Sequence, residues 1–367
     1  MPKLLIISSY ADSINAVRPE GRLFVGLVRE HGWEVTLMTQ DGSPYTDVMK
    51  NAGVRIIDFH PTGKFEAASV AKIRKELIEG GYDILHLYNN KAIVNGIRAA
   101  KGLSVKVCTY RGYTGNISWW DPIAYLQHLS PRVDMITCVS PAVKEVFDHV
   151  PFFDANKAVV VGKGHEPAWY ADVTPLDLKG EFDIPSDRLV IGIVANARRM
   201  KGMNYLTAAM RKLPAGLPIH FLFIGRGLDS KENLKDINKS SYTDRVTFAG
   251  FRKDVLRLLR ASDISLLPSV KGEGLSKVLL ESMFLARPTI MTSIGGNRHL
   301  GIDGETALIV PPRDPDALAA AIIKLATDSS LRSLLGPAGR DYVHKHFSAE
   351  VSAQELDEAY RDLLNRS

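Results

Sequence analysis

Short apolar runs rich in β-branched residues alternate with amphipathic stretches of helical length along most of the chain. In the first half these runs predict strands at 4–8, 34–38, 55–59, 84–87, 105–110, 135–139 and 158–161. In the second half they predict strands at 190–195, 220–224, 246–248, 264–267, 289–292 and 307–310. Continuous apolar strands that alternate with helices favour parallel sheets covered on both faces. We therefore expect an α/β protein with two doubly wound, Rossmann-like parallel-sheet domains.

The two sets of strands are separated by a stretch without periodicity that contains Pro175 and Pro185. This pattern predicts a first domain at 1–172, a linker at 173–188 and a second domain at 189–348. The chain then ends in helices at 317–327, 330–346 and 349–365, and Pro337 and Gly339 are expected to interrupt the middle one. Parallel sheets bind ligands beyond the carboxyl ends of their strands, so two facing sheets would form an interdomain cleft.

Composition narrows the class of protein. Of the 367 residues, 45% are hydrophobic and 24% are charged, as in a soluble globular protein. No apolar run approaches the ~20 residues of a membrane-spanning helix. Two cysteines in apolar runs suit buried thiols in a cytoplasmic protein. The net charge of +5 fits a phosphate-rich ligand or an anionic membrane surface, or simply reflects surface composition; no nucleic-acid-binding motif is present.

The segment 268–281 carries the richest chemistry. A predicted strand ends at Pro268, and a glycine-containing loop leads into a helix expected to start near Ser276, whose side chain can cap it. The first N–H groups of such a helix bind phosphate through oriented donors and partial positive charge. Glu273 and Glu281 flank this anion site, and the second suits a ribose diol. The alternative is a capped helix with a solvated Glu273 and an ion-paired Glu281.

A second segment, 193–202, follows the first strand of the second half. Arg198 and Lys201 lie three residues apart, so both can converge on one anion. A solvated basic turn is the alternative reading of the same pattern.

The second half resembles the retaining glycosyltransferases of family 4, which have the GT-B fold. The resemblance rests on landmarks in family order over about 130 residues: Arg198-x-x-Lys201-Gly202, Phe223-Ile-Gly225, Val246-x-Phe-x-Gly250, Ala261-Ser-Asp263, Leu267-Pro-Ser269, Glu273-Gly274 with Glu281, Ala286-Arg-Pro288, Gly295-Gly296, Gly304 and Pro311-Pro-Arg-Asp-Pro315.

The resemblance implies a transferase that moves a sugar from a nucleoside-diphosphate sugar with retention at the anomeric carbon. Glu273 would hold donor-sugar hydroxyls, while Arg198 and Lys201 would neutralise the departing diphosphate. Fixed positive charge, rather than a metal, would stabilise that leaving group; no cofactor is expected. The remaining donor-binding residues implied are Asn196, Gly274, Leu275, Ser276, Lys277, Glu281, Phe251 and Arg252.

The first half resembles the family less closely. The first strand-to-helix loop, expected at 10–26, would face the donor with Arg18, Glu20 and Gly21. Arg111, followed by Gly112, stands where many members carry a histidine, and it would hold a phosphate or an anionic sugar, or bridge loop carbonyls. His165 is a weaker candidate, as are His86 and His128. The aromatic stretch 119–129 is read as core, with an acceptor lid or a membrane-touching surface as the alternatives.

The expected acceptor is a glycan or lipid-linked glycan of bacterial polysaccharide or lipopolysaccharide assembly. We expect a cytoplasmic location and leave open whether the protein also contacts the inner face of the cytoplasmic membrane. In this fold the last helix, 349–367, commonly packs back on the first domain. The rival readings are another GT-B enzyme of sugar nucleotides, such as an epimerase, and a non-catalytic nucleotide-sugar-binding subunit.

Overall fold

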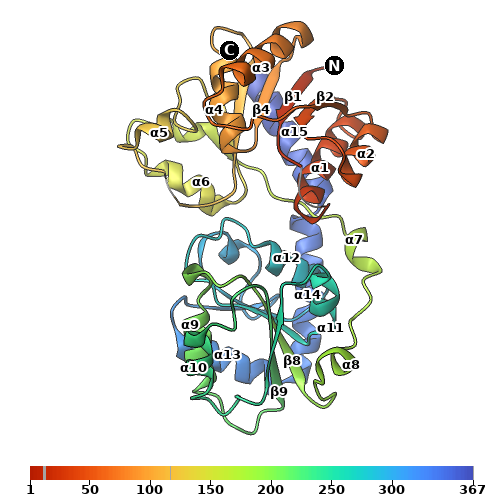
Figure 1. Ribbon diagram of the computed structural model, residues 1–367, viewed down its shortest axis with the longest axis vertical. Coiled ribbons are helices and arrows are strands. Elements are labelled where there is room, and N and C mark those ends of the chain that lie inside the picture. Colours follow the sequence, from red (N-terminus) through yellow and green to blue (C-terminus); the bar gives the residue numbers. More distant parts are fainter. Residues whose placement is uncertain (11–13, 116, 367) are drawn as a thin grey trace. The chain divides into compact units, whose positions relative to one another are not determined.

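The computed structural model describes residues 1–10, 14–115 and 117–366, and the side chains of these residues except 14–18 (Figure 1). The chain forms two compact units. The first comprises Met1–Glu166 and Phe347–Ser367, and the second comprises Pro167–His346.

The first unit contains a sheet of parallel strands in the order β3-β2-β1-β4-β5-β6-β7. Each strand coincides with an apolar run of the sequence; their bounds are β1 Lys3–Ile7, β2 Glu34–Thr39, β3 Arg55–Asp58, β4 Ile84–Leu87, β5 Lys106–Arg111, β6 Met135–Cys138 and β7 Ala158–Val160. The strand order reverses direction between β1 and β4, which is the switch point of a doubly wound sheet.

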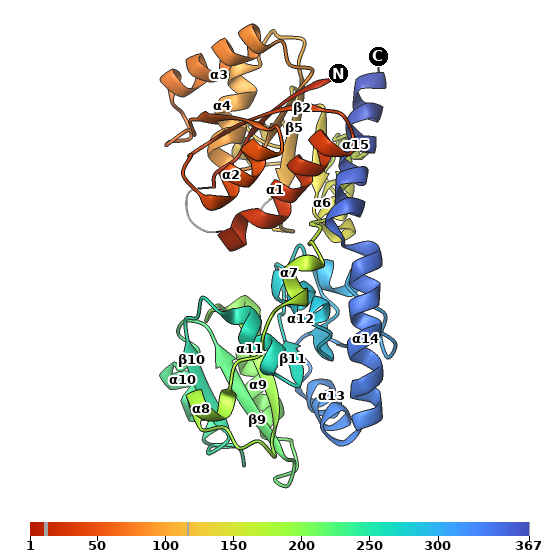
Figure 2. The same cartoon turned by 90° about the vertical axis from the view of Figure 1, so that its right-hand side faces the viewer.

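Helices of the first unit form two groups (Figures 1 and 2). The helix α1 (Ile14–Arg29) packs beside α2 (Pro44–Asn51) and α15 (Ala349–Asn365), while α3 (Ala67–Gly80) packs on α4 (Asn90–Ala99). Shorter helices are α5 (Pro122–Tyr125), α6 (Pro141–Asp148) and the 3-10 turn η1 (Ala155–Lys157). The right-handed crossovers of parallel strands place the two groups on opposite faces of the sheet.

The core of the first unit joins the two ends of the chain. Leu356, Tyr360 and Leu363 of α15 are buried in the same cluster as residues of β1, β2 and α1. The indole N–H of Trp33 donates to Asp357 at 2.6 Å, and the hydroxyl of Tyr360 lies 2.5 Å from Nδ1 of His86. The last helix is therefore part of the first unit's core rather than an appendage.

The second unit contains a sheet of parallel strands in the order β10-β9-β8-β11-β12-β13. Their bounds are β8 Leu189–Val194, β9 Ile219–Ile224, β10 Val246–Gly250, β11 Ile264–Leu267, β12 Thr289–Thr292 and β13 Leu308–Val310. The helices are α7 Ala168–Ala171, α8 Leu178–Phe182, η2 Arg199–Lys201, α9 Met203–Met210, α10 Lys231–Ile237, α11 Val255–Ala261, α12 Lys277–Phe284, η3 Gly295–His299, α13 Pro315–Thr327 and α14 Ser329–His346. The predicted fold class, two Rossmann-like parallel-sheet domains, is confirmed.

Three local features differ from the expectations. Residues 173–188 belong to the second unit, because Leu178 and Ile184 are buried in a cluster with Val190 and Leu258. Residues 18–21 lie inside α1 rather than in a loop, because the buried residues Leu23, Phe24 and Leu27 hold that helix on the core. In both places proline predicts a loop or linker, but the burial of neighbouring apolar side chains in the folded unit outweighs that local preference.

The third difference is α14, which runs without a break through Pro337. Its glycines allow close packing: a Cβ on Gly336 would lie 2.5 Å from the Ala286 carbonyl oxygen, and one on Gly339 would lie 2.7 Å from that of Thr306. The predicted interruption is therefore wrong, because the glycines serve contact with neighbouring segments instead of ending the helix. No helix in the described part of the chain is both long enough and apolar enough to span a bilayer.

Candidate donor site in the second unit

Two loops of the second unit bring together the predicted acid and base. The ammonium group of Lys201, at the end of η2, lies 2.5 Å from Oε1 of Glu273 in the loop before α12. The hydroxyl of Ser269 donates to the same carboxylate oxygen at 2.8 Å. Only 8% of Glu273 is exposed, so burial and two donors fix its carboxylate in one place. In the sequence Ser269 is visible only as part of a family landmark, which gives it no role.

Glycines allow these two loops to touch. Gly202 has φ +70°, and a Cβ there would lie 2.0 Å from the carbonyl oxygen of Pro268. Gly296 donates its N–H to the Glu273 carbonyl at 3.0 Å, and a Cβ on it would lie 1.6 Å from the Gly274 carbonyl oxygen. Neither position accepts a side chain without movement of the backbone around Glu273. Gly296 is thus a further site residue, visible in the sequence only as a family landmark.

The helix α12 begins at Lys277, with Ser276 at the N-cap position. The predicted cap is wrong in detail, because the Ser276 side chain makes no cap hydrogen bond. The first turn contains no acidic residue, and Lys277 is instead offset by Glu281, 3.4 Å away one turn later. The backbone N–H groups at this helix start retain the geometry that suits an anion.

A cavity of about 340 Å³ collects five of the residues predicted for the donor: Asn196, Arg198, Lys201, Phe251 and Arg252. Its volume is near the lower end of the range for small-molecule sites. Arg198 is exposed, and its side chain makes no ion pair with any described residue. A cation free to meet a ligand and a second cation held by a buried carboxylate thus line one cavity.

The far side of this cavity is formed after β10. Phe251 is 57% exposed, and the guanidinium of Arg226 stacks on its ring at 4.5 Å. Arg252 is engaged by Asp254 at 2.7 and 2.8 Å and by Glu181, and these hydrogen bonds raise the pKa of its guanidinium. Its side chain is committed to these carboxylates, so the ring of Phe251 and the backbone are what this loop offers a ligand.

The first-unit candidates are dispersed. Glu20 forms an ion pair of 2.8 Å with Lys163, and both line a small cavity of about 20 Å³ with Tyr88 and Tyr110. Gly21 packs so tightly on Tyr45 that a Cβ would lie 2.1 Å from its ring. The side chain of Arg18 lies outside the described residues. Lys163 is the residue that the sequence reading missed; its place between Gly162 and Gly164 was the only signal.

Arg111 is buried and contacts its own loop, as in the reading in which it bridges loop carbonyls. It is 3% exposed, donates to the Gly115 carbonyl and stacks over the ring of Tyr113 at 4.2 Å. Burial lowers the pKa of its guanidinium. It therefore braces its own loop, and Gly112 lies against the hydroxyl of Tyr110, 2.9 Å from where its Cβ would be.

The three histidines named from the sequence, His86, His128 and His165, are all buried in the first unit. The backbone of His165 bridges Phe347 and Ala349, at 2.9 and 3.0 Å, and so ties the chain's exit from the unit to the start of α15. His86 bonds to Tyr360 and Thr137, and His128 bonds to Thr109 at 2.9 Å. Burial lowers the pKa of both rings to about 3, so they are uncharged at neutral pH.

The aromatic stretch before Pro131 is exposed instead of packed. Trp119 is 52% exposed and Trp120 is 71% exposed, and Ile123, Tyr125 and Leu126 are each about half exposed. Ala124 and Leu129, at 6% and 5%, are the apolar residues of this stretch that are buried, together with His128 at 4%. The reading of the whole stretch as core is wrong, because most of its large apolar side chains are exposed.

Comparison with known proteins places this geometry in a class. The family model described as "Glycosyl transferases group 1" matches residues 188–328, and that described as "Glycosyltransferase Family 4" matches residues 22–169. Solved glycosyltransferases share the two parallel-sheet units, which are those of the GT-B fold. The chain belongs to glycosyltransferase family 4.

Three relatives illustrate the similarity. The phosphatidyl-myo-inositol mannosyltransferase of Mycolicibacterium smegmatis is 26% identical over 79% of this chain and 74% of its own length. The Escherichia coli UDP-Gal:alpha-D-GlcNAc-diphosphoundecaprenol alpha-1,3-galactosyltransferase is 23% identical over 92% of this chain and 91% of its own. Anabaena HepE, solved in complex with UDP, is 18% identical, with a TM-score of 0.78 over 99% of this chain and all of its own.

Proposed function

We propose that this glycosyltransferase takes a sugar from a nucleoside-diphosphate sugar and transfers it, with retention at the anomeric carbon, to a glycan or lipid-linked glycan. The observation that carries the proposal is the pairing of Lys201 with the buried Glu273, beside a cavity that Arg198 lines. The names of two relatives, one solved with UDP and one a UDP-Gal transferase, make a uridine diphosphate sugar the first donor to test. Nothing in the relatives favours the rival epimerase.

Each proposed role follows from the chemistry of the group. In transfer, the bond from the anomeric carbon to the diphosphate oxygen breaks and one to the acceptor oxygen forms on the same face, while the proton of the acceptor hydroxyl passes to the departing diphosphate. Negative charge grows on the departing diphosphate. The guanidinium of Arg198 and the N–H groups of Leu275 and Ser276 can stabilise this charge by hydrogen bonding. This fixed charge supports a reaction without a metal.

The two glutamates are proposed to bind different parts of the donor, the sugar and the ribose. The carboxylate of Glu273 retains acceptor positions besides those used by Lys201 and Ser269, and these suit donor-sugar hydroxyls. Glu281, one turn into α12 and paired to Lys277, suits the ribose diol. Phe251 offers an exposed ring beside the cavity for the base.

The acceptor is proposed from the relatives and from one surface. The E. coli relative is named for a diphosphoundecaprenol-linked acceptor, and the M. smegmatis relative for a phosphatidylinositol. Trp119, Trp120 and Tyr125 form an exposed aromatic surface of the kind that settles at a lipid–water interface. We therefore extend the proposal to polysaccharide or lipopolysaccharide assembly at the inner membrane face.

A donor screen tests the proposal. Nucleoside diphosphates and their sugars are titrated against the protein by thermal shift, and nucleoside-diphosphate release is followed with lipid-linked glycan acceptors. A product whose anomeric configuration equals that of the donor by NMR, formed equally in EDTA, is expected. Absence of binding to every nucleoside diphosphate would refute the donor site, while an inverted product would refute retention alone.

A further inference from the structure

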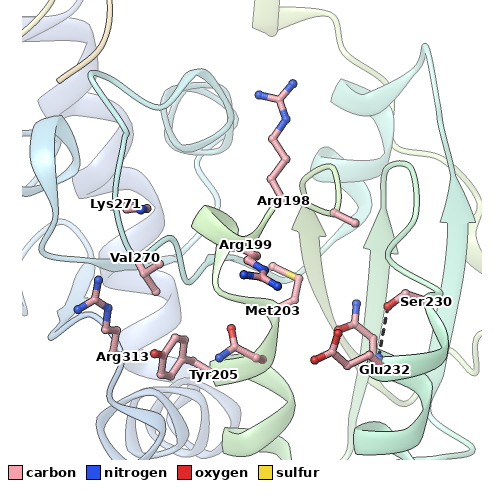
Figure 3. A pocket seen from close by; sticks show the side chains of 12 residues that line it. Arg198, Arg199, Met203, Tyr205, Ser230, Glu232, Val270, Lys271 and Arg313 are labelled. Carbon is pink, nitrogen blue, oxygen red and sulfur yellow. Dashed lines mark hydrogen bonds between the residues drawn. The ribbon is translucent and has the colours of Figure 1, made fainter. Parts of the chain in front are cut away.

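A second pocket of the second unit, of about 650 Å³, adjoins the donor cavity and is lined by an excess of cations (Figure 3). Arg198, Arg199, Lys271 and Arg313 line it with a single acid, Glu232. Arg198 also lines the donor cavity, whereas the other three cations line only this second pocket among the cavities described. We call this the basic pocket.

Three cations of the basic pocket make no ion pair with the described side chains, whereas some other cations of the unit do. Lys201, Lys212 and Arg252 each contact a carboxylate within 4 Å. Arg199, Lys271 and Arg313 contact none among the described side chains, and all three are exposed. Their guanidinium and ammonium groups therefore keep their hydrogen-bonding capacity for a ligand, and together they give the hollow a positive potential that favours an anion.

The loops that carry these cations are fixed in place. The N–H of Val270 donates to the Met200 carbonyl at 2.8 Å, which joins the loop of Lys271 to that of Arg199. Asp314 caps α13 through the N–H groups of Asp316 and Ala317, at 3.0 and 2.9 Å, directly after Arg313. Arg313 itself has φ +63°, a conformation that disfavours non-glycine residues and that occurs more often at functional sites.

The other side of the pocket differs in chemistry. Figure 3 shows Arg313 and Lys271 on one side of the view and Ser230 and Glu232 on the other, with Arg199 between them. Ser230 is held as the N-cap of α10 by the Asn233 N–H at 3.3 Å, and the Asn233 amide nitrogen donates to the Leu228 carbonyl at 2.8 Å. The Glu232 carboxylate and the Asn233 amide oxygen are acceptors available to hydroxyl groups.

From this two-sided lining we propose that the basic pocket binds a sugar phosphate, with its phosphate among Arg199, Lys271 and Arg313 and its hydroxyls toward Glu232 and Asn233. The volume is in the range of small-molecule sites and exceeds what a lone phosphate needs. The ligand is either a free sugar phosphate or the phosphate-bearing part of an acceptor; both share this chemistry. The proposal concerns binding and does not depend on the proposed donor.

Calorimetry with three probes tests the site: glucose 1-phosphate, inorganic phosphate and the uncharged methyl glucoside. We expect glucose 1-phosphate to bind at least tenfold more tightly than either of the other two. Equal affinity for phosphate and glucose 1-phosphate would overturn the two-sided site, and no binding of either would overturn the pocket altogether.

The variant Lys271→Ala/Arg313→Asn is expected to lose at least tenfold in affinity for glucose 1-phosphate. Asparagine tolerates the left-handed backbone at 313, so folding is retained. The control Lys324→Ala/Arg340→Ala removes equal charge from exposed positions on α13 and α14. An equal loss in the control would overturn the proposal in favour of non-specific charge.

Affinity for the nucleoside diphosphate, measured in parallel, should stay within twofold in both variants. If neither the wild type nor either variant binds a nucleoside diphosphate, the donor site is refuted, whereas the proposal for the basic pocket is unaffected. Once turnover is established, competition of glucose 1-phosphate with the acceptor would support the site and identify the acceptor as the phosphate's source. Inhibition or activation without competition would support it as a separate ligand site.

Discussion

At the scale of residues, Glu273 and Glu281 share a segment but not an environment. Glu273 is held by Lys201 from another loop and by Ser269, whereas Glu281, whose side chain is nearly as buried, is paired with Lys277 of its own helix. We predict that Glu281→Ala weakens nucleoside-diphosphate binding about tenfold, because one charged hydrogen-bonding group is worth roughly 1.5–3 kcal/mol. Glu273→Ala should lower kcat by at least 100-fold with less effect on binding. Calorimetry and steady-state kinetics separate the two effects.

The control for this pair is Glu305→Ala, an exposed acid in the same unit that should leave both quantities unchanged. Since removal of Glu273 also leaves the Lys201 ammonium without its carboxylate, Glu273→Gln is the milder test. Similar small effects of both alanine variants would contradict the division of roles.

At the scale of elements, the contact between the loop before α12 and η3 depends on Gly296. A methyl group there would meet the Gly274 carbonyl at 1.6 Å, so Gly296→Ala must displace the backbone beside Glu273. We predict at least tenfold weaker donor binding with a fall in Tm of several degrees. Gly216→Ala is the matched control, because a Cβ at 216 meets no atom within 4 Å. Unchanged donor affinity in Gly296→Ala would show that the loop does not shape the site.

The surface around α5 yields a second prediction at this scale. Trp119→Ser/Trp120→Ser should reduce co-sedimentation with vesicles of phosphatidylethanolamine and phosphatidylglycerol at least fivefold, because interfacial tryptophans supply the contact. Phe65→Ser changes an equally exposed aromatic residue of the same unit and should have no effect. If the wild type does not sediment with vesicles, the aromatic surface serves another purpose.

At the scale of the whole molecule, acid stability depends on buried histidines of the first unit, one of which, His86, contacts the last helix. His86 and His128 have pKa values of about 3 in the folded protein, and near 6.5 when unfolded. Between these values the unfolded chain binds more protons, so the free energy of unfolding falls as pH decreases from about 6.5 toward 3. At pH 5 each histidine should cost about 2 kcal/mol relative to neutral pH.

Hydrogen exchange of β4 and β5 amides against pH measures this loss within the first unit. The variant His86→Gln should show a shallower decline than the wild type, whereas His149→Gln, which changes an exposed histidine, should retain the full slope. An identical slope in His86→Gln would mean that other groups carry the acid sensitivity.

Local patterns were sufficient for the strands and for the loops that follow them. Every strand coincides with an apolar run, since most strands are buried along their length, and the edge strands β3 and β10 are partly buried. The same patterns placed Glu273, Arg198 and Lys201 in segments after strands, and Glu281 in the helix beyond.

Local patterns failed at Pro19, at Pro337 and in the segment 173–188. Each of these places carries proline or polar residues that favour a loop, yet each lies beside side chains that the core buries. Phe24 holds α1 on the first unit, and Leu178 holds the predicted linker on the second. The burial of such neighbours outweighs the local signal, and it becomes visible only once the chain has folded.

The sequence alone determined the fold class, the family and which segments carry the candidate donor residues, because each rests on periodicity or on residues near one another in the chain. Tertiary structure decided which charges meet. It paired Lys201 with Glu273 across 72 residues, committed Arg252 and Arg111 to structural partners, and gathered Arg199, Lys271 and Arg313 from three loops. Such pairings depend on where separate strands end in space, and no local pattern contains that information.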